Sequence, residues 1–306
     1  LLPAHAQLAD PPGTTYTDAG FEYTVLEDGT LSITDYRGTG GAVSIPAAYN
    51  SIAVSEIGND AFKNDTISSV DIPSAIRSIG NSAFENCNLL QTVTLSDGLK
   101  TIGTQAFKNS GITAVTIPAG ITSFGAYAFE YCDDLQTVTL SDGLKTIGSQ
   151  AFRNCDALQY TTIPPSVTTI GNSAFDGCDL FKKAVMLFEK ASLGGQLFHD
   201  TAISSDGIYG FAGSDAQKYA DGNHIPFHRL FKVSYDSLGG SGVHFDYVTT
   251  TGVKVNAPSD PIRSGCTFSG WYTDAAYSHA WNFGTDAVTK DLTLYAKWLC
   301  NVSFNT

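Results

Sequence analysis

The sequence lacks any apolar stretch approaching the ~20 residues of a membrane-spanning helix, so we expect no such helix in this chain. Basic residues are also scarce: 17 Lys and Arg stand against 30 Asp and Glu, for a formal net charge of −13. Phosphate contacts require clustered Lys and Arg, so this balance argues against a nucleic-acid partner. The composition instead fits a soluble, secreted protein.

Motifs of catalysis and cofactor binding are missing as well. The sequence contains no Gly-x-Ser-x-Gly nucleophile motif, no phosphate-binding glycine loop and no Cys-x-x-Cys pair. His224 and His228 have the spacing of zinc ligands on a helix, but Pro226 between them opposes a helix. The Asp-Gly pairs lack calcium-loop spacing and predict turns. We therefore expect a protein that is not an enzyme and that holds no cofactor or metal.

What the sequence does contain is a Phe that recurs about every 22 or 23 residues. Each copy lies in Ile-Gly-x-x-Ala-Phe or a close variant; the six are Phe62, Phe84, Phe107, Phe129, Phe152 and Phe175. A unit of this length cannot bury an apolar face alone, so six or seven turns should stack into a solenoid with one continuous core. The Leu-x-x-Val-x-Leu pattern that follows predicts one strand of a parallel sheet per turn.

The turns also differ from one another in a regular way. Ile-Pro and Leu-Ser-Asp-Gly exits alternate, and residues 90–109 match residues 135–154 at all but two positions. We interpret the duplicated unit as a pair of turns. The Gly that lies three residues before the Ala of each Ala-Phe pair should lie where a side chain would clash.

Four of the six cysteines occupy one position of the repeat. Cys87, Cys132, Cys155 and Cys178 should therefore form a buried column of free thiols, because buried Cys behaves as a small apolar residue. Parallel side chains on stacked turns suit a disulfide badly. Cys266 and Cys300 lie outside the repeat, and whether they form a bridge stays open.

The run Ile-Gly-x-x-Ala-Phe-x-x-Cys-x-x-Leu-x-x-Val-x-Ile-Pro resembles the BspA-like leucine-rich repeat of bacterial surface proteins. Residues 21–36 resemble the N-terminal hairpin of that family and residues 208–227 its closing unit, so the resemblance covers 20–231. It implies a mainly β fold with short helical or 3-10 turns, in which a right-handed leucine-rich-repeat solenoid carries a parallel sheet. It also implies a non-catalytic role in adhesion or ligand binding outside the cell. We read Ser214 and Gln217 as the capping box of a short helix in the closing unit.

Residues 232–299 resemble the Listeria/Bacteroides repeat, which is similar to the internalin B-repeat. The matching segments are 233–240, 268–272 and 294–298. The resemblance implies a small β-grasp-like module, and Trp271, Trp281 and Trp298 are expected in its core.

The two ends carry weaker signals. Residues 1–19 are expected to be an N-terminal tail, in which Leu1–Ala6 has the small-x-small form of a signal-peptidase site. Residues 302–306 repeat the start of the module at 233–237, so we expect 300–306 to begin a further module.

If the function is binding, the outward side chains of the strands are the first candidates. The candidate residues are Gln91, Thr94, Thr116, Gln136, Thr139, Gln159, Tyr160 and Thr162. Thr also suits a strand without any ligand, and among these residues Tyr160 is the one aromatic. We expect an extracellular, secreted or surface-attached monomer that binds a host or microbial surface protein, a matrix component or a glycan. A structural spacer, or a non-catalytic part of a larger extracellular enzyme, remains an alternative.

Overall fold

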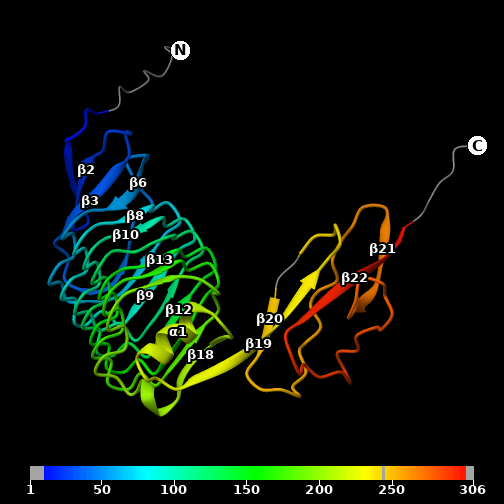
Figure 1. The fold of residues 1–306 in the computed structure, drawn as a ribbon. Coiled ribbons are helices and arrows are strands. Elements are labelled where there is room, and N and C mark those ends of the chain that lie inside the picture. The colour runs from blue at the N-terminus through cyan, green and yellow to red at the C-terminus, as the bar shows by residue number, and fades with distance from the viewer. Residues whose placement is uncertain (1–9, 243–244, 301–306) are drawn as a thin grey trace, which may run out of the picture. The chain divides into compact units, whose positions relative to one another are not determined.

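The computed structural model describes residues 10–242 and 245–300. The chain divides into two compact units, of which the first comprises residues up to 208 together with 214–226, and the second comprises 209–213 together with residues from 227 onward. Figure 1 shows the path of the chain. Each unit is described by itself below.

The first unit begins with an antiparallel meander. Strands β1 (Thr15–Asp18), β2 (Phe21–Val25) and β3 (Leu31–Tyr36) pair in order, and β3 then pairs in parallel with β6 (Ile52–Ile57). A short β5 (Ala48–Tyr49) pairs antiparallel with β6. The predicted hairpin over 21–36 is therefore present, and it passes directly into the solenoid.

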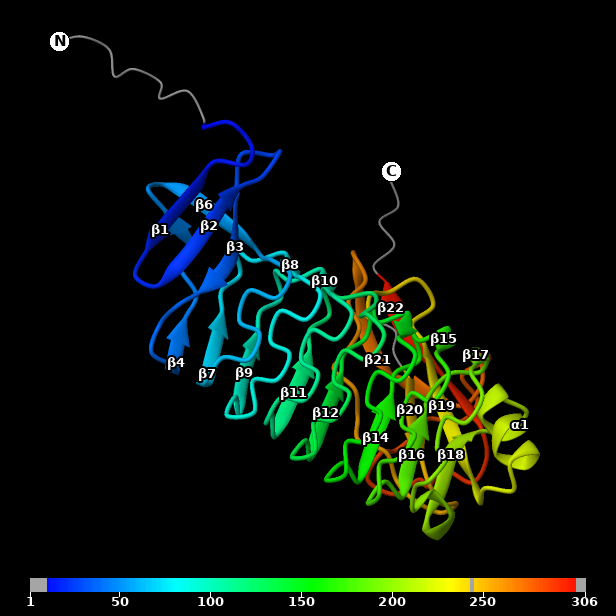
Figure 2. The same ribbon diagram turned by 90° about the vertical axis from the view of Figure 1, so that its left-hand side faces the viewer.

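The main sheet of the solenoid is built from the Leu-x-x-Val-x-Leu segments, one strand per turn. Five parallel strands pair in the order β4, β7, β9, β11, β12, and Figure 2 shows them side by side with β14 and β16. Their bounds are β4 Gly41–Ser44, β7 Ile67–Ile72, β9 Thr92–Leu95, β11 Ala114–Ile117, β12 Thr137–Leu140, β14 Tyr160–Ile163 and β16 Lys183–Met186. Strand β14 lies beside β12, where the Thr161 hydroxyl donates to the Val138 carbonyl at 3.5 Å. It pairs on its other side with β16.

A second ladder of two-residue strands runs along another side of the solenoid at the Ile-Gly segments. Strands β8 and β10 continue from β6, and β13, β15 and β17 form a further parallel set (Figures 1 and 2). Their bounds are β8 Ser78–Ile79, β10 Thr101–Ile102, β13 Thr146–Ile147, β15 Thr169–Ile170 and β17 Ser192–Leu193. The glycine is required by close approach, because a Cβ on Gly125 would lie 2.4 Å from the Thr104 nitrogen of the preceding turn.

The recurring Phe residues form one continuous stack in the core. All six are 0% exposed, and neighbouring ring centroids from Phe62 to Phe175 lie 4.9–5.4 Å apart. Phe198 extends the stack at 5.6 Å and marks a seventh Phe-bearing turn. Tyr36 stacks on the first ring at 5.1 Å, and Tyr219 meets Phe198 edge-on at 6.1 Å. An aromatic ring therefore closes each end of the stack.

The C-terminal cap of the solenoid supplies the short helical elements that were expected. A 3-10 turn η1 (Ile203–Ser205) precedes β18 (Gly207–Phe211) and α1 (Asp215–Gly222). Ser214 caps α1, since its hydroxyl accepts a hydrogen bond from the Gln217 nitrogen at 3.3 Å. Among residues 10–242 and 245–300, no helix is long and apolar enough to cross a membrane.

The second unit contains a mixed sheet in the order β20, β19, β22, β21. Strands β19 and β22 pair in parallel at its centre, and β20 and β21 flank them antiparallel. Their bounds are β19 Phe227–Asp236, β20 Phe245–Val248, β21 Cys266–Tyr272 and β22 Leu292–Cys300. Trp271 is buried in the core, while Trp281 and Trp298 pack against it partly buried. Cys266 and Cys300 lie opposite each other on β21 and β22 and form a disulfide, which answers the open question about this pair.

Candidate functional site

The predicted binding residues lie on the strands of the main sheet or directly before them, since Gln91, Gln136 and Gln159 each precede the first residue of a strand. Seven of the eight side chains are exposed, and Thr162 is half-buried. Tyr160 is the most prominent, with 56% of its surface exposed. The strands alternate, so that Val93, Val115 and Val138 point into the core between these outward residues.

The structure brings part of this set into direct register. Thr116 lies opposite Thr139 on neighbouring strands, and backbone hydrogen bonds align Gln91 and Gln136 through Thr113 between them. Thr94 lies opposite Asp71 instead. Gln159, Tyr160 and Thr162 belong to the next sheet segment, where Tyr160 lies opposite Lys183 and Thr162 opposite Val185. The set therefore forms a surface spread over several turns.

A second column of side chains was missed in the sequence. The residue directly after each stacked Phe is charged or titratable, and its sign alternates from turn to turn. The column consists of Lys63, Glu85, Lys108, Glu130, Arg153, Asp176 and His199. The sequence does contain this pattern, one residue after each Phe. It is hard to recognise because the charge sign alternates and no single residue type repeats from turn to turn. We call these seven residues the charge column.

Ion pairs connect the members of the charge column across successive turns. Lys63 lies 3.0 Å from Glu85, Lys108 lies 2.9 Å from Glu130, and Arg153 bridges Glu130 at 3.2 Å and Asp176 at 3.6 Å. The Glu130 side chain is only 3% exposed and contacts a cation on each side. A buried carboxylate needs such partners, so the column is a structural network within the solenoid wall.

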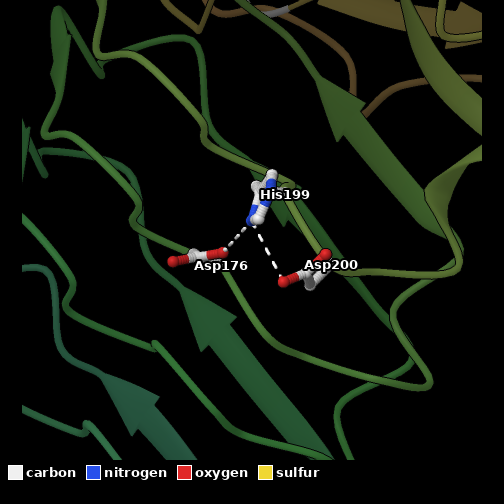
Figure 3. Close-up of side chains that lie close together, drawn as sticks. All are labelled: Asp176, His199 and Asp200. Atoms are coloured by element: carbon white, nitrogen blue, oxygen red, sulfur yellow. Dashed lines mark hydrogen bonds and ion pairs between the residues drawn. The ribbon is translucent and has the colours of Figure 1, made fainter.

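The column ends in the cluster shown in Figure 3, where the side chains of Asp176 and Asp200 converge on one nitrogen of His199. The His199 Nδ1 atom lies 3.1 Å from an Asp176 oxygen and 3.3 Å from an Asp200 oxygen. These three groups are the types that ligate metal ions. However, Asp176 also faces the Arg153 guanidinium, which would repel a bound cation. The arrangement is better explained as the end of the charge column, where His199 and Asp176 share a hydrogen bond.

The four cysteines of the repeat form the buried column that was predicted. All are free, and each thiol donates to the carbonyl of a stacked Phe from the preceding turn, at 2.9–3.1 Å. Burial raises the pKa of the Cys87 thiol to about 12 and that of the Cys132 thiol to about 11. Such thiols carry almost no thiolate at neutral pH, which makes them hydrogen-bond donors of the core and poor nucleophiles.

One turn of the solenoid differs from the others in the residue types at its two positions of positive φ. Two such positions recur in every Phe-bearing turn, and they hold small or polar residues except in the turn of Phe129. That turn carries Tyr127 at φ +61° and Tyr131 at φ +59°. A bulky residue in the left-handed region is uncommon and strained, so these tyrosines mark the turn as unusual.

Comparison with known proteins agrees with this architecture. Six copies of the BspA type leucine-rich repeat region match residues 55–182, and the Listeria-Bacteroides repeat domain matches residues 231–297. The crystal structure of a T. pallidum leucine-rich repeat protein has a TM-score of 0.59 and 27% identity, and covers 70% of this chain and 98% of its own. The pneumococcal vaccine antigen PcpA has a TM-score of 0.52 at 24% identity, covers 58% of this chain and 51% of its own, and shares the fold.

Two proteins of Evansella cellulosilytica match a shorter part of the chain. One is named a Gly-rich membrane protein and the other a membrane protein; they are 43% and 39% identical over 72 residues, or 24% of this chain. The match spans only 8% and 11% of their own lengths. Family models and solved structures thus agree on the two parts of the chain. The solenoid belongs to the BspA-type leucine-rich repeats, and the unit that follows it is a Listeria-Bacteroides repeat domain.

Proposed function

We propose that this chain is a non-catalytic bacterial surface or secreted protein that binds partner proteins through the outer face of its main parallel sheet. One observation carries the proposal. The side chains that the repeat directs inward form the Phe stack and the Cys column, whereas β9, β11, β12 and β14, together with the Gln residues directly before three of them, present a row of exposed amides and hydroxyls. A row of this kind suits an extended partner better than a small substrate. Relatives named as membrane proteins support a location at the cell envelope.

The test is binding of the purified chain to immobilised extracellular-matrix extract and to whole epithelial and bacterial cells. Saturable binding is expected, and it should be lost in a Gln136→Lys, Gln159→Lys, Tyr160→Asp variant, because new charges on the face would oppose docking. A variant with the same charge changes at exposed positions outside the main sheet, Thr101→Lys, Ser123→Lys and Thr122→Asp, should still bind. Equal binding by both variants would rule out the strand face as the site.

A spacer function is the second candidate, and the composition of the face favours it. Tyr160 is the one aromatic among the eight candidate residues, while protein-binding hot spots are enriched in Trp, Tyr and Arg. If the chain binds nothing in the matrix and cell assays, the spacer function replaces adhesion.

A further inference from the structure

A notch opens in the solenoid where one turn is shorter than its neighbours. Between the repeated Cys or Ser and the next buried Leu or Ile, the turn of Phe84 has Asn88 and Leu89, and the turn of Phe129 has Asp133 and Asp134. The turn between them has only Gly111. The missing residue leaves a cavity of about 190 Å³, whose wall includes Asn88, Asn109, Gly111, Tyr131, Asp133 and Asp134.

The floor of the notch cannot be filled by a side chain. A Cβ added to Gly111 would lie 2.4 Å from the Asn88 carbonyl oxygen, far inside van der Waals contact with backbone. The recess therefore follows from how the three turns stack, since position 111 cannot carry a side chain without a backbone shift.

An asparagine ladder ends at the wall of this notch. The Asn86 amide donates to the Asn64 side-chain oxygen, and the Asn109 amide donates to the Asn86 side-chain oxygen, both at 2.9 Å. The next turn carries Tyr131 where the ladder would need another Asn. Within residues 10–242 and 245–300, the Asn109 side-chain oxygen consequently receives no hydrogen bond.

The charge around the notch is uncompensated. In the part of the chain that the structure describes, neither Asp133 nor Asp134 forms an ion pair. Burial and the nearby carboxylates of Asp156 and Asp134 raise the pKa of Asp133. Lys108 lies 5.8 Å from the Tyr131 ring centroid, but its ammonium is held by Glu130 at 2.9 Å. The notch thus offers hydrogen-bond acceptors and negative charge beside the aromatic ring of Tyr131, a residue that is 39% exposed.

We propose that this notch binds one arginine side chain of a partner protein. The planar guanidinium stacks on Tyr131 and donates to the carboxylates of Asp133 and Asp134 and to the Asn109 side-chain oxygen, which gives each of these four side chains a contact of matching chemistry. The volume suits a single side chain, since pockets for drug-sized ligands measure ~300–1,000 Å³. The net charge of −13 attracts a basic partner segment over longer distances. This site shares no residue with the strand face.

The test uses the full chain, labelled with ¹⁵N, and three peptides: acetyl-Gly-Gly-Arg-Gly-Gly-amide and its Lys and citrulline counterparts. The arginine peptide should shift the amide signals of residues 109–111 and 131–134 saturably. The lysine peptide should bind at least about threefold more weakly, because an ammonium neither stacks nor donates as a planar fork, and the uncharged citrulline peptide weaker still. Equal shifts with the lysine or citrulline peptide would overturn the arginine assignment.

Three variants locate the site. Tyr131→Asn should fold at least as well as the parent, since Asn tolerates positive φ and continues the ladder, yet it should weaken arginine binding by at least about tenfold. Tyr127→Gln makes a comparable change at the other positive-φ position of the same turn, outside the notch wall, and should bind like the parent. Unchanged binding in Tyr131→Asn, or in the Asp133→Asn, Asp134→Asn double variant, would refute the proposal. The strand-face variant should retain arginine binding, so failure of one site is distinguishable from failure of the other.

Discussion

Replacing Glu130 by Gln tests whether the charge column stabilises the solenoid. The glutamate side chain is 3% exposed and joins the Lys108 ammonium at 2.9 Å to the Arg153 guanidinium at 3.2 Å. Glutamine keeps the volume but removes the negative charge, so two cations remain on either side of a neutral amide. Removing one partner of a buried ion pair costs about 3–5 kcal/mol. Because Lys108 and Arg153 remain 25% and 34% exposed and are partly rehydrated, we expect a loss of about 2–3 kcal/mol.

The assay is urea unfolding followed by circular dichroism, because all three Trp lie in the second unit and their fluorescence does not report on the solenoid. Glu85→Gln is the matched control, since its side chain is more exposed at 15% and its loss should be smaller. In a double-mutant cycle with Lys108→Met, the two losses should sum to more than the loss of the double variant, because they share one ion pair. A change below about 0.5 kcal/mol for Glu130→Gln, or strict additivity in the cycle, would refute the reasoning.

Three further predictions concern the core, the pH response and the disulfide. Phe107→Ala should lower the free energy of unfolding by about 3–5 kcal/mol in the same urea assay, because the ring is fully buried between two stacked neighbours. Burial raises the pKa of Asp65 to about 6, with a contribution from Asp35, so the folded state binds its proton more tightly than the unfolded state does. Stability is therefore lost as the pH rises from about 4 to about 6, and Asp65→Asn should raise Tm at pH 7.5 but not at pH 3.5. Reducing the bond between Cys266 and Cys300, which are 34 residues apart, should destabilise the second unit by about 3–4 kcal/mol, measured by Trp fluorescence with and without dithiothreitol. An unchanged transition would contradict this.

Apolar periodicity predicts most of the solenoid correctly and fails at identifiable residues. The Phe stack, the glycine positions and the Cys column follow from strict repetition of residue type. The turn of Phe198 was not among the six predicted turns, because it has Leu193 and Leu197 where the pattern requires Ile and Ala. Both leucines are nevertheless apolar. The disulfide could not be assigned from the sequence, because it depends on the register between two strands that are distant along the chain.

The candidate sites were predictable to different degrees. Alternation along each strand is enough to place Thr116 and Thr139 on the outer face, and the structure finds both exposed. The notch is different, because it depends on a one-residue difference in turn length and on Tyr131 adopting a positive φ. Propensity assigns a positive φ to Asn or Gly, so a tyrosine in the sequence gives no indication that its backbone adopts this conformation.

The alternating charge column restricts how a solenoid of this kind lengthens or shortens during evolution. Deleting the single turn that contains Glu85 would bring Lys63 next to Lys108, and inserting one turn would place like charges together in the same way. Adding or removing two turns preserves the alternation. The near-identical segments 90–109 and 135–154 fit this rule, since each ends just after a cation of the column and the two are separated by one anionic turn. Alternating charge in the wall thus favours the duplication of turns in pairs in this chain.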